Sequence, residues 1–374
     1  MTWPLRELGD LIESHDARRQ PVKESERRPG PFPYYGASGV IDSVDSFIFD
    51  GEYALLAEDG ENLRTRKTPV AFLASGRFWV NNHAHVFQAN KDAVTRYLVY
   101  ALCGTDLAGY LSGSTQPKLT AKAMNRIKVP CPPTRMQQEI GGLLGALDDK
   151  IDVNQRIAAG AERLAVSELA GCAEHCDWVQ LGDLAEHLKN TVKPAGIDGL
   201  VDHFSLPAFD AGRRPMREAA AAIKSNKLRV PDRAVLLSRL NPRIPRVWYA
   251  RTTPGVPAVC STEFLVLQPT GGLSEAELFA ACSHPEVLAD MARRAGGTSG
   301  SHQRVKPADA MAVVVPNPDS ERLRSVLTPL IEAAAQARAE SEHLAELRDA
   351  LLPKLLTGEL RVGEAEEALE EAAL

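Results

Sequence analysis

The sequence has no long apolar run and few cysteines. None of its 374 residues falls in a stretch of eighteen consecutive apolar residues, which argues against a membrane-spanning helix. Its six cysteines are scattered, which favours reduced thiols over a disulfide framework. Residues 1–10 lack the apolar segment of a signal peptide. We therefore expect a cytoplasmic protein with no membrane association.

Motifs for catalysis and metal binding are also absent. The sequence contains no GxxxxGK[ST] phosphate loop, no GxGxxG turn and no HExxH helix. The run Asn241-Pro242-Arg243-Ile244 lacks the second proline and the aromatic residue of the amino methyltransferase motif. Only Cys172, His175 and Cys176 cluster, without further ligands at metal spacing. We therefore expect neither a catalytic residue nor a metal site, and no cofactor bound by this chain.

Two further polar pairs receive structural interpretations. His83 and His85 share one face of a predicted strand, and the neighbouring sequence offers no carboxylate or cysteine to complete a metal site. We expect them to be structural or to face DNA. Asp148 and Asp149 lie on a predicted helix, where solvated carboxylates are more common than catalytic ones.

Length and charge indicate several domains with different surfaces. The length corresponds to two or three domains. The net charge of −6 is concentrated in two segments, since residues 133–176 carry −3 and 319–374 carry −7. Residues 1–132 and 177–318 carry +1 and +3. The acidic charge therefore does not exclude nucleic-acid binding by the other two blocks.

The two acidic segments have helical periodicity. Apolar or small residues recur every three or four positions in both, which predicts two long amphipathic helices of about 35 residues. The first stripe contains Ile140, Leu143, Leu147, Ile151, Ile157, Ala161, Leu164 and Leu169. The second contains Leu323, Leu327, Leu330, Ala334, Ala337, Ser341, Leu344 and Leu351, and closes at Pro353. Small residues within the stripes favour close approach of the two helices, and Asn154 on the first seam is placed to fix register. The alternative, that each stripe packs onto its own domain, stays open.

The same features occur twice in the same order, about 180 residues apart. LGDL at 8–11 recurs at 181–184, and ALL at 54–56 corresponds to VLL at 235–237. VFQ at 86–88 corresponds to VLQ at 266–268, GST at 113–115 to GTS at 297–299, and VP at 129–130 to VP at 315–316. The chain is therefore predicted to be a tandem repeat of a globular block followed by one long helix.

Each block mixes short strands with short helices. The sequence predicts strands at 40–49, 54–57, 78–88, 234–237, 247–249 and 264–267, and helices at 94–102, 275–282 and 286–294. The expected fold class is α+β, with tandem domains whose long helices pair as an antiparallel coiled coil. The expected boundaries are 1–133, 134–176, 177–318, 319–357 and an acidic tail at 358–374.

Basic residues within the blocks form four stretches without acid, which lie at 62–91, 107–138, 233–262 and 291–308. Such positive stretches suit a phosphate backbone, and amide side chains beside them suit base edges. The alternative is a solvated face balanced by distant acids. The candidate DNA contacts are Arg64, Arg66, Lys67, Asn82, Gln116, Lys118, Lys122, Arg239, Asn241, Arg243, Arg246, Arg304 and Lys306. His302 and Gln303 have suitable side chains in the last stretch.

Several runs resemble the specificity subunit of type I restriction-modification systems. In the first half these are YYGASGVID at 34–42, FDGEYALLAEDG at 49–60, VNNHAHV at 80–86, GSTQPKLT at 113–120, QQEI at 137–140 and LDDKI at 147–151. In the second half they are LNPR at 240–243 and LRDALLPKLLTGEL at 347–360. The resemblance covers essentially the whole chain, with departures at 201–227 and in the tail at 363–374.

The resemblance implies a non-catalytic subunit that recognises a bipartite site in double-stranded DNA. Residues 1–133 and 177–318 would be target recognition domains, and the two long helices a spacer between them. The implied partners are two methyltransferase subunits and restriction subunits. The implied cofactors, S-adenosylmethionine, ATP and Mg, would be bound by those partners.

Three other interpretations are weighed against this one. A self-sufficient methyltransferase-nuclease requires the cofactor motifs that are missing, and a pure coiled-coil scaffold does not require the basic stretches. A specificity-like adaptor that acts as an orphan, or in another defence system, shares the same sequence features. A neighbouring methyltransferase gene would separate the subunit from the adaptor.

Overall fold

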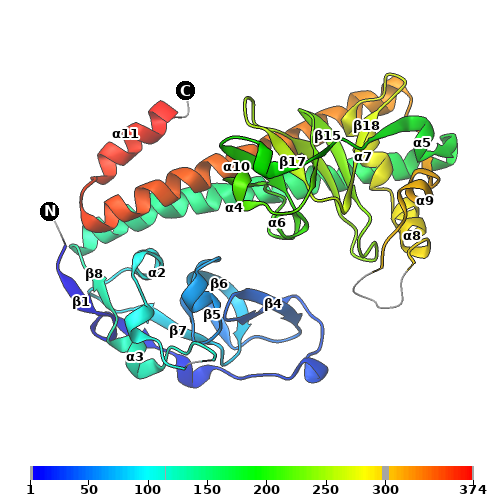
Figure 1. The fold of residues 1–374 in the computed structure, drawn as a ribbon. Helices are drawn as coiled ribbons and strands as arrows, with labels where there is room; N and C mark the ends of the chain where they lie inside the picture. The colour runs from blue at the N-terminus through cyan, green and yellow to red at the C-terminus, as the bar shows by residue number, and fades with distance from the viewer. Residues whose placement is uncertain (1–2, 114, 297–302, 373–374) are drawn as a thin grey trace. The chain divides into compact units, whose positions relative to one another are not determined.

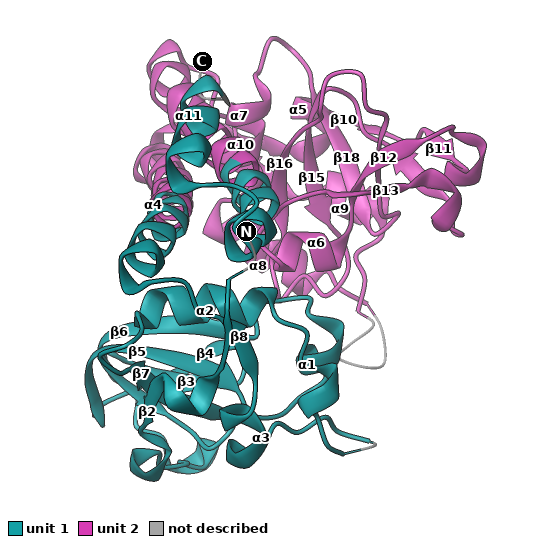
Figure 2. Ribbon diagram, turned by 90° about the vertical axis from the view of Figure 1, so that its left-hand side faces the viewer, with its two compact units in different colours: residues 1–150, 344–374 teal, residues 151–343 magenta. Residues whose placement is uncertain are grey.

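The computed structural model describes residues 3–113, 115–296 and 303–372. It divides into two compact units, residues 1–150 with 344–374 (unit 1) and residues 151–343 (unit 2), as Figure 2 shows. Both long helices, α4 (Thr134–Cys172) and α10 (Glu321–Thr357), contribute one segment to each unit (Figure 1). None of the helices within the described ranges is long and apolar enough for a bilayer crossing.

Unit 1 is built on a six-stranded sheet with the order β2-β7-β5-β6-β3-β4. Its strands are β1 (Leu5–Glu7), β2 (Ile12–Ser14), β3 (Phe32–Gly36), β4 (Gly39–Val44), β5 (Phe49–Ala57), β6 (Ala71–Val80), β7 (Ala84–Ala89) and β8 (Lys128–Pro130). Its helices besides α4 and α10 are α1 (Asn62–Thr65), α2 (Thr95–Gly104), α3 (Ala121–Asn125) and α11 (Val362–Ala372). Helix α2 packs on β5, β6 and β7, and Leu144 of α4 and Leu355 of α10 belong to the same core.

Unit 2 contains two larger sheets, with the orders β10-β18-β15-β16 and β11-β14-β17-β12-β13. Its strands are β9 (Trp178–Gln180), β10 (Ala185–Leu188), β11 (Thr191–Val192), β12 (Leu200–Phe204), β13 (Met216–Ala219), β14 (Lys227–Arg229), β15 (Arg233–Ser238), β16 (Val247–Arg251), β17 (Ala258–Cys260), β18 (Phe264–Pro269) and β19 (Val314–Pro316). Its shorter helices are α5 (Leu181–Leu184), α6 (Leu206–Asp210), α7 (Glu275–Cys282), α8 (Pro285–Arg293) and α9 (Pro307–Met311).

The topology repeats between the units, as the internal sequence similarity predicted. Strands β2-β7-β5-β6 of unit 1 have the same order as β10-β18-β15-β16 of unit 2. The ribbon β1-β8 corresponds to β9-β19, with Leu5 opposite Pro130 in one and Trp178 opposite Pro316 in the other. This mixture of strands and helices confirms the α+β fold class.

The segments of α4 and α10 pair antiparallel in each unit. In unit 1, the Arg348 guanidinium lies 2.6 Å from the Asp148 carboxylate. In unit 2, Arg338 donates to Glu162 at 2.7 Å. Since the residue number on α10 falls as that on α4 rises, the two helices run in opposite directions, as predicted.

The seam of α4 differs from the predicted stripe by one position. Ile157 and Leu164 were predicted to lie in the seam, but their side chains are 47% and 48% exposed. Ala158 and Ala165 are buried instead. Seven-residue steps from Ile151 reach these two alanines, and a seven-residue spacing keeps side chains on one face of paired helices. The predicted place of Asn154 on the seam is confirmed, since the residue is 1% exposed.

The apolar stripe of α10 closes at Pro353, but the helix continues to Thr357, the end expected for the second long helix. A proline within a helix loses one backbone hydrogen bond and costs about 3 kcal/mol. Leu355 and Leu356, which follow it, are buried in the core of unit 1. Burial of two leucines contributes a similar free energy and explains why the last turn persists.

The short helices and most strands lie close to their predicted positions, and two predicted strands each divide into parts of two strands. The segment 40–49 contains most of β4 and the first residue of β5, which are separated by residues 45–48. The segment 78–88 contains the end of β6, a turn at Asn81–His83 and most of β7. At both breaks the chain passes to a strand that is not the neighbour of the preceding one in the sheet, and the apolar pattern continues through each break.

Candidate nucleic-acid interface

Three loops of unit 1 converge at the end of β5. Loop cluster 1 consists of residues 58–67, the turn 81–83 and residues 112–118 without 114. Backbone hydrogen bonds connect them: Glu58 N to His83 O (2.8 Å), Gly60 N to Pro117 O (3.1 Å), Leu119 N to Glu58 O (2.7 Å), and Ser112 with Lys118 in both directions (2.8 Å each). Most of the unit 1 candidate DNA contacts therefore lie together, from three separate parts of the sequence.

Unit 2 contains an equivalent arrangement at the end of β15. Loop cluster 2 consists of residues 239–246, the turn 261–263, Gly296 and residues 303–304. The same set of backbone hydrogen bonds recurs: Arg239 N to Glu263 O (2.9 Å), Asn241 N to Gln303 O (2.8 Å), Val305 N to Arg239 O (3.0 Å), and Gly296 with Arg304 in both directions (3.1 and 3.0 Å). The correspondence makes Lys118 equivalent to Arg304 and Glu58 equivalent to Arg239.

Loop cluster 1 holds its charged side chains in pairs. The Lys118 ammonium lies 3.4 Å from one oxygen of Glu58, whose other oxygen lies 2.6 Å from Arg19. His83 contacts Asp59 at 2.7 Å. The carboxylates that contact the two histidines come from the loop after β5 and from residue 16, and each histidine pairs with a carboxylate without a metal-binding group around it in the described residues. His83 also lies in the turn before β7 and not on a strand.

The second histidine, His85, is buried and contacts the segment that follows loop cluster 1. His85 is 1% exposed, and its Nδ1 lies 2.6 Å from Asp16 while its Nε2 lies 2.8 Å from the Leu119 carbonyl oxygen. Burial alone would raise the pKa of Asp16, but the hydrogen bond and charge of His85, the Val86 N–H and the charge of Arg19 lower it overall. His85 therefore has a structural position next to Lys118.

In loop cluster 2 one carboxylate serves two arginines. Nε of Arg304 lies 3.0 and 3.1 Å from the two oxygens of Glu263, and one of its terminal nitrogens lies 2.9 Å from the same carboxylate. Arg239 approaches Glu263 at 3.5 Å. The hydrogen bond to Glu263 and its charge raise the pKa of Arg304. Both arginines are therefore held in place before any ligand binds.

Three other candidate arginines already have partners elsewhere. Arg66 donates to the carbonyl oxygens of Thr105, Leu102 and Cys103, at 2.6, 3.0 and 3.2 Å, and so caps the end of α2. Arg246 binds both oxygens of Asp210 at 2.7 and 2.8 Å. Arg64 donates to the Gly113 carbonyl oxygen at 2.8 Å. These contacts give Arg66 and Arg246 structural roles that the sequence pattern does not reveal.

The remaining candidates differ in accessibility, and Asn241 is half-buried. Asn241 adopts a left-handed backbone with φ of 46° at the position equivalent to Gly60, where φ is 108°. Lys306 is the residue before α9. The candidates that are exposed and have no side-chain partner in the described part of the chain are Lys67, Asn82, Gln116, Lys122, Arg243 and Lys306. Ser114, the GTS run at 297–299 and His302 lie outside the described residues.

The partner carboxylates are not evident from the sequence. The basic stretches are defined by the lack of acid within them, whereas Glu263 lies at the boundary of one stretch and Asp210 lies 36 residues before Arg246. The internal repeat gives a usable signal for Glu263, because aligning the two repeats places Glu263 at the position equivalent to His83, a residue of loop cluster 1. Pairing across separate loops is otherwise invisible in the sequence.

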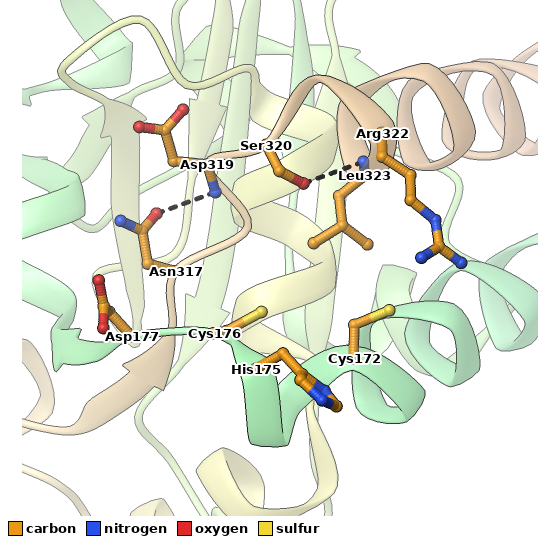
Figure 3. A pocket seen from close by; sticks show the side chains of 9 residues that line it. All are labelled: Cys172, His175, Cys176, Asp177, Asn317, Asp319, Ser320, Arg322 and Leu323. Carbon is orange, nitrogen blue, oxygen red and sulfur yellow. Dashed lines mark hydrogen bonds between the residues drawn. The ribbon is translucent and has the colours of Figure 1, made fainter.

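The residues Cys172, His175 and Cys176 line a pocket of about 530 Å³ in unit 2, between the end of α4 and the start of α10 (Figure 3). Burial and the neighbouring Cys172 and Asp177 raise the pKa of Cys176 and so favour its protonated thiol. Among the described residues, no three His, Cys, Asp or Glu side chains are grouped to hold a metal ion. The pocket therefore gives no support to a zinc site.

Comparison with known proteins finds a family model that matches the first part of the chain. Residues 1–163 match the type I restriction modification DNA specificity domain. A putative type I restriction enzyme specificity subunit of Haemophilus influenzae is 36% identical over 144 residues, which span 38% of this chain and 36% of that protein. The specificity subunit of the type I restriction enzyme MjaIX of Methanocaldococcus jannaschii is 20% identical over 410 residues, spanning 97% of this chain and 94% of that one.

A solved structure has the same fold. The crystal structure of the S subunit of a type I restriction-modification system from M. genitalium matches with a TM-score of 0.57 at 15% identity, covering 95% of this chain and 96% of that chain. The matched domain in the first half, the end-to-end similarity to a relative and the common fold agree with one another. This chain is therefore similar to type I restriction-modification specificity subunits along its length, and its first 163 residues match their DNA specificity domain.

Proposed function

We propose that this chain is the DNA-recognition subunit of a type I restriction-modification complex and that each globular block recognises one half of a bipartite site. The observation that carries this proposal is the repeated loop cluster. Two equivalent sets of loops, each with exposed or carboxylate-held cations, occur in one chain with different side chains at equivalent positions. Equivalent scaffolds with different contact residues suit the reading of two different half-sites.

The paired helices give this proposal a second element. Segments of α4 and α10 pack against both blocks, so the helix pair would act as the spacer between the two half-sites. Two methyltransferase subunits and the restriction subunits are the proposed partners, and S-adenosylmethionine, ATP and Mg would be bound there. We assign no reaction to this chain itself, because its candidate residues are suited to binding DNA.

A methylation map tests the proposal. The chain is co-expressed with the neighbouring methyltransferase in a host without adenine methylation, and methylated adenines are located genome-wide by single-molecule sequencing. We expect one motif with two defined halves separated by unspecified bases, methylated once on each strand. The methyltransferase expressed without this chain should give no such motif.

Two results count against the proposal. Methylation at the same motif without this chain would assign recognition to the methyltransferase. An assembled complex that leaves the genome unmethylated would favour the adaptor, which the similarity to specificity subunits otherwise disfavours.

A further inference from the structure

Lys118 and Arg304 occupy equivalent positions in the two repeats. Each forms a pair of backbone hydrogen bonds with a residue at the start of its loop, Ser112 for Lys118 and Gly296 for Arg304. Each lies directly before the segment that leads into a short helix, α3 or α9. The side chains are 52% and 43% exposed, so both can meet a ligand.

The carboxylate that holds each cation comes from a different place in the repeat. Glu58, at the end of β5, holds Lys118 in unit 1. The equivalent position in unit 2 is Arg239, and the acid has moved to Glu263, which corresponds to His83. The position of the cation is therefore the same in both repeats, while the residues around it differ.

The geometry of Arg304 leaves one part of its guanidinium available. Glu263 contacts Nε and one terminal nitrogen. The other terminal nitrogen has no partner within the described ranges. A guanidinium offers five N–H donors in a rigid plane, so a carboxylate on one side leaves donors on the other side in a fixed orientation.

We propose that Arg304 and Lys118 are the equivalent base-reading side chains of the two recognition blocks, and that Arg304 reads a guanine in the major groove of its half-site. This inference rests on the proposed function and names the contact within it. Guanine presents the acceptors O6 and N7, which match the N–H donors of arginine. A side chain that is already held loses less conformational entropy on binding, which sharpens discrimination.

A phosphate contact fits Arg304 less well than a base contact. The carboxylate of Glu263 offsets much of the charge of Arg304 and would lie near an approaching phosphate, which it repels. Hydrogen bonding to a base edge depends on donor geometry more than on net charge. Arg243, which is exposed and has no partner among the described residues, has the properties expected of a phosphate contact.

The same argument applied to Lys118 predicts weaker discrimination between bases. Its ammonium is a point charge on a flexible chain and cannot form the paired contact of arginine. It would read one acceptor of its base pair. Discrimination at the position read by Lys118 should therefore be smaller than at the position read by Arg304.

The test measures recognition by the whole complex with Arg304→Ala, Arg304→Lys and Arg243→Ala as the matched control. The methylation map of each variant is compared with that of the wild type. We expect Arg304→Ala to relax one guanine position of one half-site and leave all other positions unchanged. Arg304→Lys should relax the same position in part, whereas Arg243→Ala should lower methylation at all sites without changing the motif.

A second measurement covers a variant whose methylation is too weak to map. The purified complexes bind duplexes in which each half-site base pair is replaced in turn, at one salt concentration. The wild type should prefer guanine at one position by about 5- to 150-fold, and Arg304→Ala should lose most of that preference. An Arg304→Ala complex that discriminates at every position as well as the wild type overturns the inference.

The same data separate this inference from the proposed function. A wild-type split motif that survives unchanged in Arg304→Ala contradicts the role of Arg304 alone. Absence of any split motif in the wild type contradicts the proposed function itself.

Discussion

Ion pairs with carboxylates determine which basic residues of this chain are available to bind a ligand. Arg243 and Arg246 lie three residues apart in loop cluster 2, yet only Arg243 is exposed, while the side chain of Arg246 is 10% exposed and bound to Asp210. The sequence predicted both as DNA contacts from their charge. Charge is visible in a sequence, whereas the partner of a charged side chain is not, because Asp210 is the last residue of α6 and reaches Arg246 only in the folded unit.

Arg246→Ala should therefore destabilise unit 2. The bidentate pair has one largely buried partner, but Asp210 is 48% exposed, so we expect a loss of about 1 kcal/mol in the free energy of unfolding. Urea unfolding followed by the fluorescence of the buried Trp248 measures it. Arg243→Ala serves as the control and should change stability by less than about 0.5 kcal/mol. Equal effects of the two substitutions would contradict the structural role of Arg246.

Buried histidines make the stability of unit 2 depend on pH. Burial lowers the pKa of His187, His203 and His284 below the ordinary value of 6.5. A histidine with a lowered pKa binds fewer protons when folded than when unfolded, so acid favours the unfolded state. This stability is complete above pH 6.5 and decreases as the pH falls from there toward the lowered values.

We expect unit 2 to be less resistant to urea at pH 5.5 than at pH 7.5. Neither ring nitrogen of His187 has a hydrogen-bond partner among the described residues. His187→Phe should therefore flatten the pH dependence, because phenylalanine has no proton to bind. Unfolding curves for both proteins at the two pH values measure the effect, and an unchanged dependence in the variant would contradict the assignment.

At the scale of elements, periodicity identified the two long helices but not the exact face that packs. The large apolar residues Ile157 and Leu164 drew the predicted stripe to the wrong position, because leucine and isoleucine carry more weight in a hydrophobic pattern than alanine. The seam uses Ala158, Ala334 and Ala337, which bring the backbones close together. Close approach of two helices is a property of the pair and cannot be seen in one segment.

A larger side chain in this seam should separate the helices. Ala337 is 6% exposed, and Ala337→Leu should cost about 1–3 kcal/mol through overpacking. Ala339, two residues later on α10, is exposed and gives a matched control. Thermal unfolding of both variants tests this. An Ala337→Leu protein as stable as Ala339→Leu would contradict close packing of the two helices at this position.

A substitution in the last turns of α10 should stabilise the protein instead of destabilising it. Pro353→Ala restores a backbone N–H within the helix and removes the clash of the proline ring, so it should stabilise unit 1 by up to about 3 kcal/mol. Hydrogen exchange at the amides of residues 354–357 should slow in the variant. Faster exchange would indicate that α10 ends before Pro353.

At the scale of the whole molecule, the tandem repeat was the strongest prediction from the sequence, and the topology confirms it. Five short matches in the same order gave the correspondence of β5 with β15 and of β7 with β18. The loops could not be predicted in the same detail, since Glu58 and Arg239 carry opposite charges at one equivalent position. The scaffold depends on buried apolar residues that resemble each other, whereas the exposed loop residues differ between the repeats.

The central claim is that each block recognises one half-site, and a hybrid chain tests it most directly. Residues 178–316 are replaced by a second copy of residues 5–130, so that each junction falls at an equivalent pair of strands, and assembly with the methyltransferase is checked by co-purification. The methylation map should then show a motif whose two halves are both the half-site of the first block. An assembled hybrid that still recognises the wild-type second half-site would contradict the account.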